Sequence, residues 1–151
     1  MERHFDDLNG FLVGLFNDIL KIEENALRAG EYREISVRDM HIIEAVCAAG
    51  GENDNRTTAV ARDLGVTTGT LTVAVNSLVK KGYIERRQDP KDRRVVLLYP
   101  TEKALRANRA HEAFHRDMVE SVLHALTDQQ TEVLVQALNA VRAYFESRKQ
   151  G

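Results

Sequence analysis

Residues 57–99 read TTAVARDLGVTTGTLTVAVNSLVKKGYIERRQDPKDRRVVLLY. Apolar residues recur at helical spacing through 57–64 and again through 68–81. Gly65 lies between the two segments, where a left-handed residue commonly ends a helix, and Thr67 or Thr68 can cap the next one. The pattern predicts two helices joined by a tight turn.

A β-hairpin is predicted directly after the second helix. Gly82 ends that helix, and two strand-like runs follow at 83–88 and 93–99, rich in Val, Leu and Tyr. Asp89-Pro90-Lys91-Asp92 between them has the composition of a turn. The segment 80–94 contains seven basic residues against three acidic ones. This local positive charge suits a phosphate backbone, although the whole chain has a net charge of −2.

The spacing of the helix pair resembles a helix-turn-helix, whose second helix enters the major groove of DNA. The inward positions are apolar: Val60, Leu64, Val66, Leu71, Val75 and Leu78. The outward face of the second helix carries Gly69, Thr70, Thr72, Val73, Asn76, Ser77 and Lys80. Solvated helix faces usually favour Glu, Lys and Gln, so this composition favours DNA contact over a plain surface.

Long helices are predicted on both sides of this region. The first runs through the apolar positions from Phe5 to Ala26, with more large side chains than a small domain needs. A second begins near Ser36 and ends near Ala48. Thr101 and Thr127 cap the two C-terminal helices. Burial of the first helix against a second subunit would account for its apolar excess.

Composition limits the classes of protein that fit. The 151 residues are 43% hydrophobic and 29% charged, with no run long enough to span a membrane. The single cysteine, Cys47, excludes an intrachain disulfide and suits a reducing compartment, so a cytoplasmic protein is expected. Cys47 is interpreted as a small buried residue and not as a redox switch.

The segments 64–67, 78–86 and 89–94 resemble the MarR family of winged-helix regulators. The resemblance implies a mainly α fold with a small β-hairpin wing, in which 36–100 form the DNA-binding lobe. It implies that 1–35 and 101–151 form a helical dimerisation region. The expected function is a homodimeric repressor, modulated by a ligand, that binds a pseudo-palindromic operator in double-stranded DNA and has no enzymatic activity.

The family's wing carries an Asp-x-Arg pattern, matched here by Asp92 and Arg94. The resemblance implies that Arg93 or Arg94 enters the minor groove. Val73 departs from the pattern, because many relatives have an arginine there. The residues expected to contact DNA are Thr57, Thr67, Thr68, Gly69, Thr70, Thr72, Val73, Asn76, Ser77, Lys80, Arg86, Lys91, Asp92, Arg93 and Arg94.

A narrower likeness is to the FabT-type subgroup, which represses fatty-acid synthesis genes. It rests on 22–24, Met40-His41, 93–96, Phe114-His115 and 118–120, together with Gly69-Thr70 and Asn76. The likeness implies a partner, an acyl carrier protein with a long acyl chain, acting as corepressor. A small-molecule effector is the alternative.

His111-Glu112-Ala113-Phe114-His115 matches the HExxH pattern of zinc proteases, but it lies inside a long amphipathic helix, and the extended form of the pattern fails at Met118 and Ser121. A metalloenzyme is therefore a remote alternative, and an interaction module built on the first helix is another. Resemblance to zinc-responsive relatives implies a zinc site at Glu24, His41, His111 and His115. The other interpretation is an effector pocket with no cofactor, formed by Phe16, Glu24, His41, His111, Phe114 and His115.

Overall fold

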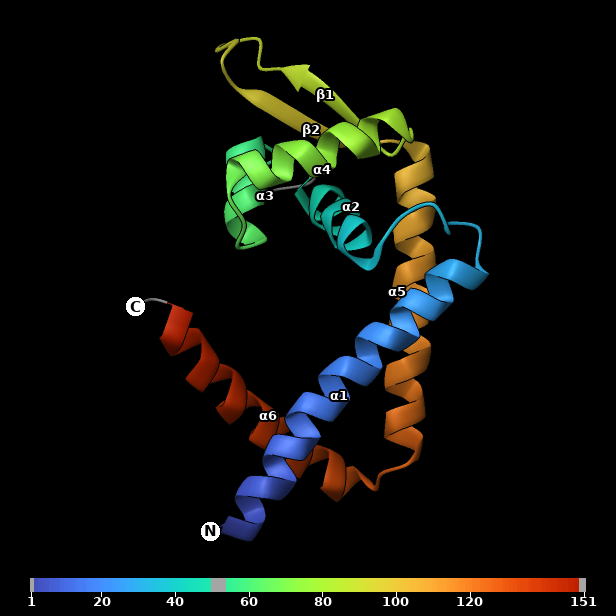
Figure 1. Ribbon diagram of the computed structural model, residues 1–151, viewed down its shortest axis with the longest axis vertical. Coiled ribbons are helices and arrows are strands. Elements are labelled where there is room, and N and C mark those ends of the chain that lie inside the picture. Colours follow the sequence, from blue (N-terminus) through green and yellow to red (C-terminus); the bar gives the residue numbers. More distant parts are fainter. Residues whose placement is uncertain (1, 50–53, 150–151) are drawn as a thin grey trace. The chain divides into compact units, whose positions relative to one another are not determined.

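The computed structural model describes residues 2–49 and 54–149 and divides the chain into two compact units, Met1–Ala110 and His111–Gly151. Figure 1 shows the order of the elements. They are α1 (Glu2–Ala29), α2 (Val37–Ala49), α3 (Thr57–Asp63), α4 (Thr68–Lys80), β1 (Ile84–Gln88), β2 (Val96–Pro100), α5 (Glu102–His124) and α6 (Asp128–Lys149). The mainly α fold with one small hairpin is as predicted.

The core of the first unit lies among α2, α3, α4, the hairpin and the start of α5. Met40, Ile43, Leu78, Tyr83 and Leu98 are completely buried. All but Tyr83, which lies in the bend before β1, come from positions that the helical or strand period turns inward. Their burial gives this unit an apolar core of its own.

Local caps explain where the helices of the first unit begin and end. Ser36 and Asp39 form a reciprocal capping box at α2, with both hydrogen bonds at 3.1 Å. Thr67 caps α4 by accepting a hydrogen bond from the Thr70 N–H at 3.1 Å. Gly65 has a φ of 66°, the left-handed conformation predicted there, and Gly82, predicted to end α4, has a φ of 79°.

The hairpin pairs β1 and β2 antiparallel, with Ile84 opposite Pro100 and Gln88 opposite Val96. The prediction that the second strand begins at Arg93 was wrong, because the ladder begins at Val96. The Asp92 carboxylate accepts a hydrogen bond from the Arg94 N–H at 3.0 Å, and the Asp92 carbonyl accepts one from the Val95 N–H at 2.9 Å. These bonds hold 92–95 in a turn and delay the strand.

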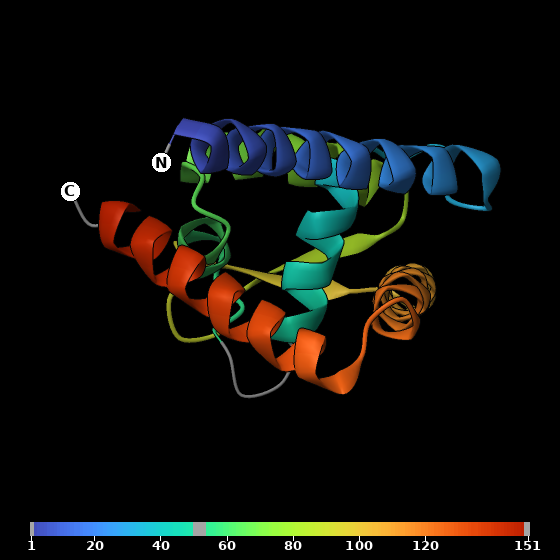
Figure 2. The ribbon, with the colours of Figure 1, turned by 90° about the horizontal axis from the view of Figure 1, so that it is seen from below.

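The helix α1 is a single long helix, with α2 crossing beneath it in Figure 2. Most of its large apolar side chains are exposed: Phe5, Leu8, Phe11, Leu15, Phe16 and Ile22. Only Glu23 among its described side chains is buried. The apolar stripe predicted from the sequence therefore has little cover within its own unit.

The second unit consists of the C-terminal part of α5 and the helix α6. Thr127 and Gln130 form the predicted capping box, with the Thr127 N–H donating to Gln130 Oε1 at 2.9 Å. Exposed apolar side chains occur on both helices: Val119, Val122, Leu123, Val133, Val135, Leu138, Tyr144 and Phe145. No helix in the described part of the chain is long and apolar enough to cross a membrane.

Candidate nucleic-acid interface

The helices α3 and α4 form a helix-turn-helix whose second helix presents one face to solvent. Leu71, Val75 and Leu78 of α4 are buried against the core, as are Val60 and Ala61 of α3. The core therefore fixes which side of α4 is exposed.

The exposed side of α4 carries most of the side chains predicted to contact DNA. Thr68, Gly69, Thr70, Val73, Asn76 and Lys80 are exposed, while Thr72 and Ser77 are half-buried. Val73 is 71% exposed, so an apolar group stands in the middle of this polar face. A valine there can contact a thymine methyl group, which is an apolar feature of the major groove.

Several of the predicted hydroxyl groups already take part in internal hydrogen bonds. Thr72 Oγ1 donates to the Thr68 carbonyl at 2.8 Å, and Thr67 Oγ1 donates to Thr70 Oγ1 at the same distance. Thr57 Oγ1 donates to the Val96 carbonyl at 3.0 Å and so links α3 to β2. These threonines help to set the shape of the surface, because their hydroxyl groups are held by internal hydrogen bonds.

An arginine of the hairpin contacts the recognition helix directly. The Arg86 guanidinium of β1 donates a hydrogen bond to Asn76 Oδ1 of α4. The side chains occur in the predicted set, but their contact was not predicted, because 10 residues separate them along the chain. The bond ties the base of the wing to the face of α4.

In the wing, Asp92 holds the side chain of Arg94. Arg94 Nε and Nη2 donate to the two Asp92 carboxylate oxygens, each at 3.1 Å. Because the guanidinium hydrogen-bonds to the ionised form, the pKa of Asp92 is lowered and that of Arg94 is raised. The Arg94 side chain remains 91% exposed. Lys91 and Arg93 are exposed beside it.

A hollow of about 230 Å³ opens between the helix pair and the hairpin. Its lining contains three arginines and four threonines with four apolar residues beneath them: Arg56, Arg86, Arg94, Thr57, Thr58, Thr68, Thr72, Val75, Val95, Val96 and Leu98. Thr57 and Thr72 donate their hydroxyl protons internally, so the donors that suit phosphate oxygens here are the guanidinium groups and the hydroxyls of Thr58 and Thr68.

Arg56 and Thr58 are polar lining residues that were not predicted from the sequence. For Arg56 the signal was present in Asp54-Asn55-Arg56, which has the same Asp-x-Arg spacing as the wing. It was overlooked because the residues stand before the first helix of the motif and outside the recognised wing.

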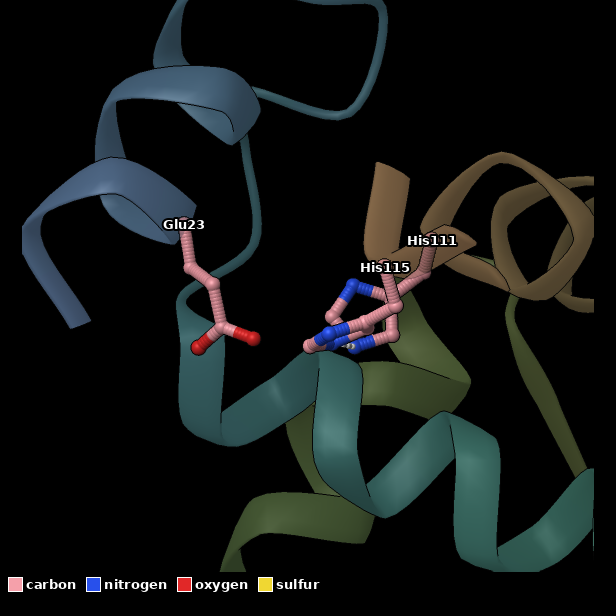
Figure 3. Close-up of side chains that lie close together, drawn as sticks. All are labelled: Glu23, His111 and His115. Carbon is pink, nitrogen blue, oxygen red and sulfur yellow. Dashed lines mark hydrogen bonds between the residues drawn. The ribbon is translucent and has the colours of Figure 1, made fainter. Parts of the chain in front are cut away.

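The carboxylate beside His41 is Glu23, whereas the sequence analysis had assigned this role to Glu24. Glu23 projects from α1, is 4% exposed, and has its Oε2 atom 3.7 Å from His41 Nε2 (Figure 3). Glu24 is exposed and pairs with Arg28 at 3.9 Å, one turn along the same helix. Successive residues of a helix differ in direction by about 100°, which explains the different environments.

His111 and His115 lie one turn apart on α5, with their rings on the same side of the helix in Figure 3. Their Nε2 atoms are 3.0 Å apart, and His111 is 6% exposed. Phe114 stacks with the His111 ring at a centroid distance of 6.4 Å. Two imidazole nitrogens this close can bind one metal ion. Phe16, predicted to line an effector pocket, is 64% exposed.

Comparisons with known proteins place this geometry in a family. The MarR family model matches residues 52–96. The chain is similar to Streptococcus pneumoniae FabT, solved in complex with DNA, with 35% identity, a TM-score of 0.87, and coverage of 95% of this chain and 98% of that chain. A comparison with curated protein sequences gives no match.

Two more distant structures share the fold. The Staphylococcus aureus MepR–DNA complex has 18% identity and a TM-score of 0.72 over 89% of this chain and 96% of that chain. The transcriptional regulator BldR from Sulfolobus solfataricus has 23% identity and a TM-score of 0.66 over 93% and 96%. The FabT likeness covers nearly the whole of both chains, and the family model matches the segment from α3 to the hairpin. The chain therefore belongs to the MarR family of winged-helix regulators.

Proposed function

We propose that this protein is a transcriptional repressor that binds DNA as a homodimer and blocks access to a promoter. The observation that carries the proposal is the exposed face of α4 beside the Asp92–Arg94 pair of the wing, within one compact unit. The solved FabT–DNA complex, from a chain 35% identical, supports DNA as the ligand.

In this proposal α4 enters the major groove and the wing follows the neighbouring minor groove. Thr70, Val73 and Asn76 contact base edges, and Arg94 enters the minor groove. Lys80 and Lys91 contribute charge toward the phosphates. Sequence preference then comes from few base contacts, so the shape of the minor groove contributes to specificity.

A second copy of the chain is proposed as the partner that covers the apolar side chains of α1. Phe5 is 68% exposed and Phe16 is 64% exposed, on a helix whose large apolar residues repeat every three or four positions. A continuous exposed apolar stripe marks a protein interface. A two-fold dimer presents two recognition helices about 34 Å apart, one turn of DNA, and so reads a pseudo-palindromic operator.

Control of fatty-acid synthesis genes is the regulatory role we propose, with an acyl carrier protein bearing a long acyl chain as corepressor. The likeness to FabT over almost the full chain supports it. The test compares DNA binding with acyl-loaded carrier protein and with unloaded carrier protein. Tighter DNA binding with the loaded form alone is expected. Equal binding in both cases would leave a small-molecule effector as the alternative.

A zinc-responsive repressor is a second candidate, favoured by the 3.0 Å distance between the His111 and His115 nitrogens. Each pair of groups, His111 with His115 and Glu23 with His41, offers ligand types that zinc accepts. Zinc titration of the metal-free protein should show one site per chain that is lost in His111→Ala. Saturable zinc binding that persists in this variant would exclude these ligands.

The DNA-binding proposal is tested with genomic fragments selected on the purified protein. Selected fragments should share an inverted repeat, and their affinity should fall steeply with salt because phosphate contacts release counterions. Arg142→Ala is a matched control, since Arg142 forms an exposed ion pair with Glu146 on α6, outside the proposed interface. Binding without salt dependence or without a shared sequence would contradict the proposal.

A further inference from the structure

Arg56, just before α3, is held by a carboxylate two residues earlier in the chain. Its backbone N–H donates to Asp54 Oδ1 at 3.0 Å, and its Nε donates to the two carboxylate oxygens at 2.8 and 2.7 Å. Nη2 also donates to Asp54. The guanidinium lowers the pKa of Asp54 to about 2, because its hydrogen bonds favour the ionised carboxylate.

The wing repeats this arrangement. Arg94 donates through its backbone N–H, Nε and Nη2 to Asp92, at 3.0 to 3.1 Å. Arg56 and Arg94 both line the hollow between the helix pair and the hairpin. Two arginines with the same local geometry therefore border one surface, although 38 positions separate them in the printed sequence.

The backbone around Arg56 is hydrogen-bonded to the hairpin, and the Asp54 carboxylate holds the Arg56 side chain. Arg56 forms an isolated antiparallel bridge with Leu97 of β2. The neighbouring Asn55 accepts a hydrogen bond from the Leu98 N–H at 2.9 Å and donates through Nδ2 to the Leu98 carbonyl at 3.2 Å. A side chain on such a support loses less conformational entropy when it binds.

We propose that Arg56 is a further DNA-binding residue that donates to a backbone phosphate at the hollow beside the wing. The carboxylate engages Nε and Nη2, so Nη1 is the nitrogen with which Arg56 would donate to a phosphate. Thr58 and Thr68 place hydroxyl groups on the same lining. The contact adds affinity without reading sequence, since phosphates are the same at every base pair.

This inference rests on the proposed DNA binding and has a separate test. The affinity of wild type and Arg56→Ala for a random pool of DNA duplexes about 30 base pairs long is measured over a series of salt concentrations. Arg56→Ala should bind about tenfold more weakly at low salt. The slope of log affinity against log salt should fall by about 1 per protomer, or about 2 per dimer.

Arg62→Ala is the matched control. Arg62 is also exposed, also pairs with a nearby aspartate, Asp63, at 3.2 Å, and lies on α3 outside the hollow. It should retain the wild-type salt slope. Equal losses in both variants would show a general effect of charge and would overturn the assignment of Arg56.

Two further arms separate the possible failures. Arg56→Gln keeps a donor for Asp54, and its DNA binding should also fall, with a thermal midpoint close to wild type. An unchanged slope in both Arg56 variants, with steep salt dependence in wild type, would overturn the Arg56 contact alone. No DNA binding by wild type would instead contradict the proposed function.

A titration with inorganic phosphate tests whether the hollow binds a free anion. No saturable binding of phosphate is expected. A saturable site that is lost in Arg56→Ala, with DNA affinity unchanged, would assign the hollow to a free anion and overturn the DNA contact.

Discussion

The segment from α2 to β2, here called the reading part, and the long helix α1 use similar apolar residues in opposite ways. Leu78 and Tyr83 of the reading part have no exposed surface, whereas Phe5 and Phe16 of α1 are 68% and 64% exposed. Helical periodicity indicates that a face is apolar but does not say which molecule covers it. The difference teaches that the reading part builds its core from one chain, while the apolar face of α1 has little cover in its own unit and is the face we propose a second copy covers.

Removal of a core side chain should give the largest effect on stability. We expect Leu78→Ala to lower the free energy of unfolding by about 2–5 kcal/mol, because removal of the completely buried leucine leaves a cavity in the core. Urea denaturation measures the change. Leu138→Ala on α6, where the leucine is 46% exposed, is the control and should cost less. Equal losses would mean that α6 is as tightly packed as the reading core.

A charge on the apolar face of α1 should weaken the dimer more than it weakens the fold. Phe16→Glu is expected to raise the dimer dissociation constant about 100-fold, because a carboxylate would be buried without a partner. Analytical ultracentrifugation over a range of concentrations measures it. Val73→Glu places the same charge on the exposed face of α4, and this variant should remain dimeric. Dissociation of both variants, or of neither, would exclude α1 as the dimer surface.

The reading part could be predicted from the sequence because its signals are local. Ser36 with Asp39, Thr67 with Thr70, and the left-handed Gly65 each act over three or four residues. Inward positions followed from the helical period once those ends were known. The prediction that a strand starts at Arg93 was wrong because of another local contact. The Asp92 carboxylate accepts a hydrogen bond from the Arg94 N–H and holds this segment in a turn.

The remaining features depend on contacts between distant parts of the chain. The bond from Arg86 to Asn76, and the fastening of Asn55 to Leu98, join segments that no periodicity relates. Glu23 and Glu24 are neighbours on α1, and their side chains point in directions about 100° apart. A motif match to the sequence does not resolve which of the two faces His41. The site residues of the DNA face stay predictions, supported by the exposure of most of them.

Removal of the wing arginine should affect DNA binding and leave the core intact. Arg94→Ala is expected to reduce affinity about tenfold for selected and random duplexes alike, with a salt slope lower by about 1 per protomer. The physical reason is the loss of an exposed cation that Asp92 orients. Fluorescence anisotropy measures the change, with Arg142→Ala as control. A loss confined to selected sequences would instead indicate that Arg94 reads bases.

Glu34, in the segment between α1 and α2, connects that segment to the reading part through a small polar cluster. Tyr83 Oη donates to Glu34 Oε1 at 2.5 Å, and Lys103 Nζ lies 3.0 Å from the same atom. These two bonds, the tyrosine first, lower the pKa of Glu34 to about 2 from its usual 4.5. The same contact, with burial as the larger cause, raises the pKa of Tyr83 well above its ordinary value.

The smallest expected effect is the loss of this link in Glu34→Gln. Since the folded state favours the carboxylate, its contribution is complete above the usual pKa of 4.5 and is lost as the pH falls toward 2. The side chain is 38% exposed, so water screening limits the contribution at neutral pH to roughly 0.5–1 kcal/mol. Urea denaturation at a series of pH values from 7 downward measures the free energy of unfolding of both proteins. The difference between wild type and Glu34→Gln should narrow below about pH 4 and vanish toward pH 2. Glu24→Gln, which removes only the surface pair with Arg28, should show a smaller gap at neutral pH. If the difference in free energy of unfolding between wild type and Glu34→Gln does not narrow in acid, the substitution acts by disturbing the packing around Tyr83 and not by removing the charge of Glu34.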